Sequence, residues 1–214
     1  MGVLPVNKLL LSMSVPIMIS MLVQAFYNIV DSMFVAQVSE NALTAVSLAF
    51  PIQQLLVAIG VGTGVGINAL ASRGLGEKNY HKSNMVANNG LYLSLIATVI
   101  FVIFGIFGSR PFFEIQVANE EIVSYGTQYL MVVCCFSIGI FTSITFERIL
   151  QATGNPTYTM ITQGLGAIIN IILDPIFIFG LFGMPRLEVM GAAMATVIGQ
   201  IASGALGLYF SLKK

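Results

Sequence analysis

Long hydrophobic segments recur along the whole chain, separated by short polar, charged or proline-containing segments. Each is long enough to cross a bilayer, because an α-helix needs about 20 apolar residues to span the hydrocarbon core. No long linker and no low-complexity segment divides the chain, so we take residues 1–214 as a single transmembrane lobe. The pattern predicts an all-α polytopic membrane protein, a six-transmembrane-helix bundle with spans at about 10–37, 45–72, 84–108, 122–145, 157–181 and 189–211.

The composition supports a membrane protein. Of 214 residues, 57% are hydrophobic and 8% are charged, and the mean hydropathy is +0.90. A soluble domain carries roughly 25% charged residues, so this chain cannot cover itself with polar surface and lipid must be its solvent. The formal net charge is zero, which excludes a strongly basic nucleic-acid-binding protein.

The basic residues are divided unevenly between the two sets of predicted loops. If the N-terminus is cytoplasmic, seven basic residues lie inside and two outside. The inner set is Lys8, Arg73, Lys78, Lys82, Arg148, Lys213 and Lys214, and the outer set is Arg110 and Arg186. Because cytoplasmic loops carry an excess of Lys and Arg, we expect a multi-pass protein of the plasma membrane with both termini in the cytoplasm.

The sequence contains no motif typical of an enzyme or of a resident metal centre. Cys134 and Cys135 are adjacent within an apolar run, where inert packing is the usual role of a thiol. His81 is the only histidine, and it lies in a polar loop. There is no C-x-x-C, H-E-x-x-H, P-loop or G-x-S-x-G sequence. We therefore expect a protein that is not an enzyme and needs no cofactor.

Two acidic residues, Asp31 and Asp174, lie inside predicted spans. A charge at the centre of a membrane helix costs roughly 2.5–3.5 kcal/mol on insertion scales, and neither residue has a Lys or Arg partner within a span. At about 1.5 Å per residue, both would lie roughly 10 Å below the outer surface. The two carboxyls must therefore face a polar interior, be protonated or hold a cation, and we interpret them as functional.

Further polar residues form a stripe with Asp31 in the first span and with Asp174 in the fifth, and a third polar stripe lies in the sixth span. The sets are Gln24, Asn28 and Asp31 with the neighbouring Tyr27 in the first span, Gln163, Asn170 and Asp174 in the fifth, and Thr196, Gln200 and Ser203 in the sixth. The spacing of each set places it on one helical face. Interhelical hydrogen bonding alone is the alternative explanation. Three polar stripes that meet inside a bundle predict an oxygen-rich cavity.

The chemistry of such a cavity follows from desolvation. Removal from water disfavours the ionised form of a carboxyl, and a second carboxylate nearby disfavours it further. Such a pair can take up and release protons, or it can bind Na⁺ through carboxylate, amide and hydroxyl oxygens. Either ion neutralises the charge that would attract an organic cation, so ion and substrate would compete for one site, as in an antiporter.

Two prolines lie within or beside these stripes. Pro16 removes one backbone hydrogen bond in the first span, and Pro175 directly follows Asp174 in the fifth. A broken helix beside an ionisable group is common at transport sites. We expect both prolines to act as hinges, with a static kink as the alternative.

Five short motifs are spread over nearly the whole chain. They are Pro16 with Asp31 fifteen residues later, ASRGLG at 71–76, ERILQATGNP at 147–156, NIILDP at 170–175 and GAAMAT at 191–196. In combination they resemble the N-terminal half of the MATE (multidrug and toxic compound extrusion) transporters, close to the bacterial multidrug branch. The resemblance implies a fold in which about twelve helices form two six-helix lobes, of which this chain covers the first.

The resemblance also implies a function, which is the export of cationic drugs and dyes by Na⁺ or H⁺ antiport. The residues that match the cation site of the family's N-terminal lobe are Asp31, Asn170, Asp174 and Thr196, and they would hold the Na⁺ or the proton. The position of Pro16 is linked to bending of the first helix in some members. The implied partners are membrane lipid, small cationic or amphiphilic organic substrates, and a C-terminal lobe or a second copy of this chain.

Two other functions compete with this one. A lipid-linked oligosaccharide flippase of the same superfamily would need basic residues in the cavity to hold a pyrophosphate, and no basic residue lies within a predicted span. A non-transporting membrane accessory or assembly subunit would suit the small-residue faces of the second and sixth spans. That role leaves Asp31 and Asp174 unexplained.

Overall fold

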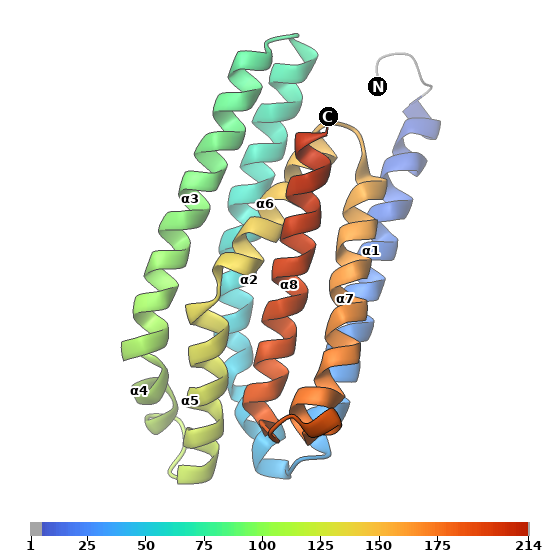
Figure 1. Cartoon of the computed structure of the whole chain (residues 1–214). Helices are drawn as coiled ribbons and strands as arrows, with labels where there is room; N and C mark the ends of the chain where they lie inside the picture. Colours follow the sequence, from blue (N-terminus) through green and yellow to red (C-terminus); the bar gives the residue numbers. More distant parts are fainter. Residues whose placement is uncertain (1–5, 214) are drawn as a thin grey trace.

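The computed structural model describes residues 6–213, and these form a bundle of long helices (Figure 1). The helices are α1 (Val6–Ala36), α2 (Glu40–Gly76), α3 (Tyr80–Phe107), α4 (Ser109–Glu114), α5 (Glu120–Cys135), α6 (Ile138–Ala152), α7 (Pro156–Phe179) and α8 (Glu188–Leu212), with a 3₁₀ turn η1 (Leu181–Gly183). Lys214 and the side chain of Lys8, both counted in the orientation argument, lie outside the described part.

Five of these helices are individually long and apolar enough to cross a membrane, namely α1, α2, α3, α7 and α8. The pair α5 and α6 meets the same criterion together, with a bend of 46° at the break between them. The described residues therefore offer up to six crossings, in an all-helical architecture. The α2–α3 and α6–α7 connections and the end of α8 lie at one end of the bundle, and the α1–α2 and α7–α8 connections lie at the other (Figure 1).

The helix of the predicted fourth span, 122–145, continues past residue 145. Helix α6 continues to Ala152, so Glu147 and Arg148 lie in a helix and the prediction that places them in a loop is wrong. The segment from Glu147 to Ala152 is rich in good helix formers. The helix ends where Gly154 adopts a left-handed φ of 81°, and Pro156 then begins α7.

Side-chain caps and an ion-pair cluster define the connection between α2 and α3. Asn79 accepts a hydrogen bond from the backbone nitrogen of Lys82 at the start of α3. The Glu77 carboxylate accepts from Arg73 Nε at 2.8 Å and lies 3.2 Å from Lys82 Nζ. The hydrogen bonds from Arg73 and then Lys82 lower the pKa of this exposed carboxyl below its ordinary value.

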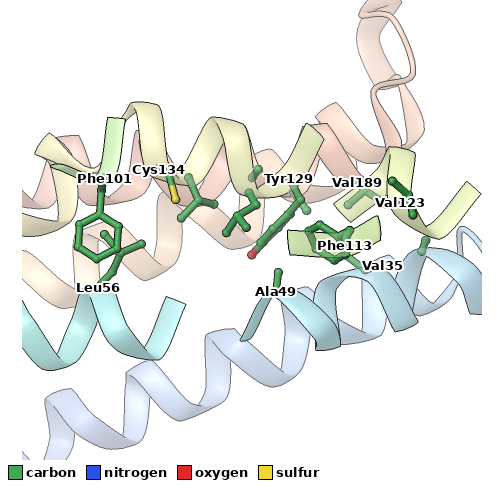
Figure 2. Packing of buried hydrophobic residues seen from close by; sticks show 14 of the residues in the cluster. Val35, Ala49, Leu56, Phe101, Phe113, Val123, Tyr129, Cys134 and Val189 are labelled. Carbon is green, nitrogen blue, oxygen red and sulfur yellow. The ribbon is translucent and has the colours of Figure 1, made fainter. Parts of the chain in front are cut away.

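A buried apolar cluster takes most of its residues from α2, α5 and α8 and includes residues of the other helices. Figure 2 shows Leu56 near Phe101, and Tyr129 near Ala49 and the ring of Phe113. Cys134 is buried in the same cluster as a free thiol.

Outside this cluster many apolar side chains are exposed, because lipid rather than protein is their neighbour. They include Met18, Leu22, Phe26 and Ile29 of α1 and Leu93, Ile96, Ile100 and Ile103 of α3.

Helices α7 and α8 approach each other at a glycine contact. A Cβ at Gly199 would lie 2.7 Å from the carbonyl oxygen of Gly166, and one at Gly166 would lie 2.9 Å from the carbonyl oxygen of Gly199. Only glycine permits backbones this close. The contact matters for the site because polar side chains flank it on both helices.

Candidate functional site

A cavity of about 260 Å³ lies between α1, α2, α6, α7 and α8, with a wall contributed by α5. Its polar lining residues are Gln24, Tyr27, Asn28, Asp31, Ser32, Gln53, Gln54, Tyr129, Ser143, Glu147, Arg148, Gln163, Asn170, Thr196, Gln200 and Ser203. The structure thus brings the three predicted stripes to one cavity. Asp174 does not line the cavity itself, but its carboxylate is hydrogen-bonded to Asn170, which does.

Asn170 joins the acid of α7 to the hydroxyl of α8. Its Nδ2 donates to Asp174 Oδ1 at 3.2 Å and to Thr196 Oγ1 at 3.2 Å. Asp174 is completely buried, and Asp31, Asn170 and Thr196 are each less than 10% exposed. Asp31 lines the same cavity as Asn170 and Thr196. We name this set (Asp31, Asn170, Asp174 and Thr196) the Asp174 layer.

Three oxygen atoms of the Asp174 layer accept no hydrogen bond from the described residues. They are Asp31 Oδ1, Asn170 Oδ1 and Asp174 Oδ2, and all three are buried. The ion pairs found in the described part of the chain involve neither aspartate. Buried acceptors without donors are costly, and carboxylate, amide and hydroxyl oxygens are the ligands of hard cations. The arrangement suits a proton or a small cation.

Glu147 is a second buried acid in the lining of this cavity, besides Asp31, and the sequence reasoning missed it. Its Oε2 accepts from Gln163 Nε2 at 2.8 Å, and its Oε1 lies 3.3 Å from the Ser143 hydroxyl. A signal was present, because Ser143, Glu147 and Gln151 follow i, i+4, i+8 and all three are buried. The adjacent Arg148 and the Gly-Asn-Pro that follows made this segment resemble a loop.

Arg148 also corrects an expectation about the cavity. The sequence predicts no basic residue there, but Arg148 lines the cavity and is half-buried. Its Nη1 donates to Gln151 Oε1 at 2.9 Å, and its Nε is buried without a partner among the described residues.

Two further residues of the cavity wall were not predicted. Gln53 of α2 donates from Nε2 to the phenol oxygen of Tyr129 at 2.6 Å, and Tyr129 is almost completely buried. The bond ties α2 to α5 beside Asp31. Neither residue lies in a polar stripe of its own helix, so their pairing could be recognised only once the helices are packed.

The two predicted hinge prolines lie within continuous helices. Pro16 is inside α1 and Pro175 is inside α7. The carbonyl oxygen of Pro16 accepts from the Ser20 hydroxyl at 2.9 Å, one turn later. Neither proline ends its helix, and their hinge role stays a prediction.

The chain is similar to known membrane transporters over most of its length. The model of the MatE family matches residues 16–176. A multidrug export protein, MepA of Staphylococcus haemolyticus, is 33% identical over 208 residues, which are 96% of this chain and 45% of that protein. An FAD transporter of Shewanella oneidensis is 29% identical over 210 residues, which are 98% of this chain and 46% of that protein.

Solved structures give the same family. The MATE multidrug transporter DinF-BH superposes with a TM-score of 0.92 at 34% identity and covers 100% of this chain. An outward-facing multidrug resistance MATE transporter of the MOP superfamily gives a TM-score of 0.87 at 31% identity over 95% of this chain. The chain covers 47% and 44% of these two proteins and so spans about half the length of its relatives.

Proposed function

Because the chain belongs to the MatE family, we propose that it forms one lobe of an exporter that exchanges organic cations for Na⁺ or H⁺. The relatives are named as transporters and not as enzymes, in agreement with the sequence prediction. The chain matches one lobe of the solved MATE transporters, which are about twice as long. The second lobe, or a second copy of this chain, would supply the other wall of the transport path.

The observation that carries the proposal is the Asp174 layer. Asn170 joins the buried carboxyl of Asp174 to the hydroxyl of Thr196, and the buried carboxyl of Asp31 lines the same cavity. Three oxygens of this layer accept no hydrogen bond from the described residues. A bound Na⁺ or a proton would neutralise the layer, whereas an ionised layer would attract a cationic substrate into the adjoining cavity. Asp31 and Asp174 would carry the charge, and Asn170 and Thr196 would orient it.

The position of the Asp174 layer near helix ends and prolines is consistent with a site whose exposure changes during transport. Asp31 lies between one and two turns before the end of α1 at Ala36, and Asp174 is as far from the end of α7 at Phe179. In the proposed orientation both would open toward the outside of the cell. Pro16 and Pro175 each leave a backbone carbonyl without its helical donor, so bending at these points would change the exposure of the layer. The membrane would be the plasma membrane, with both termini cytoplasmic.

Arg148 favours a second candidate, an anionic substrate. One relative is named as an FAD transporter, and FAD carries a pyrophosphate that an arginine can bind. The cavity lining nevertheless contains one arginine and two acids, Asp31 and Glu147, and Asp174 is hydrogen-bonded to the lining residue Asn170. The balance of charge favours cations, and the same argument disfavours a lipid-linked oligosaccharide flippase. A non-transporting accessory subunit would give no reason for three buried acids.

Ethidium binding to the chain in lipid nanodiscs tests this function. Fluorescence anisotropy would be measured in Na⁺ and in choline, and at acidic and alkaline pH, for the wild type, Asp174→Asn and the exposed control Glu114→Gln. We expect Na⁺ or acid to weaken ethidium binding by about tenfold in the wild type and the control, because typical coupling between sites is 5–150-fold. Asp174→Asn should lose this dependence. The same dependence in all three proteins would contradict the role of Asp174.

A further inference from the structure

Glu147 is a buried carboxylate that the Asp174 layer does not use. It is 5% exposed and lines the same cavity. Its carboxylate contacts Gln163 Nε2 at 2.8 Å and the Ser143 hydroxyl at 3.3 Å, and that hydroxyl lies 3.1 Å from Ser203 Oγ. Among the described residues it has no ion-pair partner, because the neighbouring Arg148 directs its Nη1 to Gln151. We name this set (Ser143, Glu147, Gln163 and Ser203) the Glu147 layer.

The two layers lie at different depths of one cavity. On α7, Gln163 precedes Asn170 by seven residues, and on α8, Ser203 follows Thr196 by seven residues. At 1.5 Å per residue, the layers are about 10 Å apart along both helices. The glycine contact lies between them, with Gly166 beside Ser203 and Gly199 beside Asn170. The two layers therefore offer two separate positions for a cationic group.

Resting on the proposed function for the Asp174 layer, we propose that the Glu147 layer binds the protonated amine of the organic substrate. An ammonium N–H can donate to the Glu147 carboxylate and to Gln163 Oε1, which is buried and accepts no hydrogen bond from the described residues. The serine hydroxyls supply further oxygens. Charge-assisted hydrogen bonds of this kind are about twice as strong as neutral ones. The site favours amines that carry an N–H over uncharged amides.

A purely structural role would not explain the charge of Glu147. The α6–α7 contact already contains the bond from Thr159 Oγ1 to the backbone oxygen of Glu147 at 3.3 Å. A glutamine at position 147 could contact Gln163 and Ser143 without the desolvation cost of a carboxylate. A buried carboxylate without an ion pair is destabilising, and an acid of this kind in a cavity is a candidate functional group.

Two dansyl probes that differ in one charge test the proposal. Monodansylcadaverine carries a primary ammonium, and its N-acetyl derivative is neutral. Their affinities for the chain in nanodiscs would be measured by fluorescence for the wild type, Glu147→Gln and the control Glu114→Gln. Loss of a buried charge pair costs several kcal/mol and each 1.4 kcal/mol is tenfold, so Glu147→Gln should weaken amine binding at least about tenfold. Binding of the acetylated probe should not change.

The outcomes separate this proposal from the function on which it rests. Equal amine affinity in the wild type and Glu147→Gln would overturn it, and so would an equal loss for both probes, which indicates a structural defect. Gln163→Leu removes an amide oxygen from the half-buried cavity wall and should weaken amine binding severalfold, which keeps the test open if Glu147→Gln does not fold. Failure of ion dependence at Asp174 would refute the coupling function while leaving the amine result at Glu147 intact.

Discussion

At the residue scale, the site depends on one amide. Asn170 Nδ2 makes the bonds to Asp174 and Thr196, so a single side chain connects the acid to the hydroxyl of the next helix. If Asn170 is replaced by leucine, a residue of similar size, the Asp174 carboxylate loses this donor and stays buried. The loss of stability and the loss of ion binding would then both come from the missing amide of Asn170.

We predict that Asn170→Leu lowers the stability of the chain by about 1–3 kcal/mol, the usual cost of leaving a buried polar group without its partner. It should also abolish any stabilisation by Na⁺, because an amide ligand is lost. Thermal unfolding in detergent, in sodium and in choline chloride, measures both effects. Asn28→Ala, on the exposed part of the cavity wall, is the control and should unfold like the wild type. Unchanged sodium stabilisation in Asn170→Leu would be inconsistent with the proposed layer.

A second prediction concerns Glu77, outside the membrane-spanning helices. Arg73 and Lys82 lower its pKa below the ordinary value of 4.5. A carboxyl with a lowered folded-state pKa stabilises the fold above its unfolded pKa, and this contribution is lost as the pH falls through the folded pKa. Because the group is exposed, the effect on stability is small. Carbon-13 NMR titration should show Lys82→Ala raising the pKa of Glu77, and an unchanged value would refute the contact.

The sequence predicts part of this site, for reasons that differ by residue. Asp31 and Asp174 can be recognised in the sequence because a charged residue within a membrane span is energetically costly and usually functional. Glu147 does not stand out, because Arg148 and a turn sequence follow it. Tyr129 and Gln53 approach each other only through the packing of α2 on α5, which hydropathy does not encode.

At the scale of the element, close helix packing rests on single glycines. Any side chain at Gly199 would meet the backbone of Gly166, and a backbone cannot move aside as a flexible side chain can. Gly164, which precedes Gly166 on the same helix α7, has nothing within 4 Å of a built Cβ. Gly199 and Gly164 form a matched pair for a test.

We predict that Gly199→Ala destabilises the chain and that Gly164→Ala does not. In Gly164→Ala the gain in helix propensity is up to about 1 kcal/mol, whereas in Gly199→Ala the clash separates α7 from α8. The change should also disturb both polar layers, because Asn170 and Ser203 flank the contact. Thermal melting followed by fluorescence-detected size exclusion compares the two. Equal melting temperatures for both variants would show that the contact is not tight.

The sequence predicts the positions of the long helices better than it predicts the bends between them. Hydropathy recognises all the long helices, because each must bury its backbone polar groups in its own hydrogen bonds within lipid. The break at Phe136 and Ser137, where α5 and α6 diverge by 46°, lies inside an apolar run without proline. Nothing in the local sequence marks it, and tertiary packing decides it.

At the scale of the whole molecule, the orientation in the membrane can be tested by labelling. With Cys134 and Cys135 replaced by alanine, a cysteine would be introduced by Ile115→Cys or by Lys78→Cys, both at exposed positions at opposite ends of the bundle. A membrane-impermeant maleimide should label the first in intact cells and the second only after permeabilisation. The reverse pattern would invert the proposed topology and place the Asp174 layer near the cytoplasm.

The central claim is that the Asp174 layer exchanges an ion for an organic cation. By linkage, an ion that weakens ethidium binding must itself be released when ethidium binds. Sodium release, followed by equilibrium dialysis of radioactive Na⁺, and proton release in weakly buffered solution therefore measure the exchange directly. The account predicts that ethidium releases one of these ions from the wild-type chain and none from Asp174→Asn. A wild-type chain that binds ethidium and releases neither ion would contradict it.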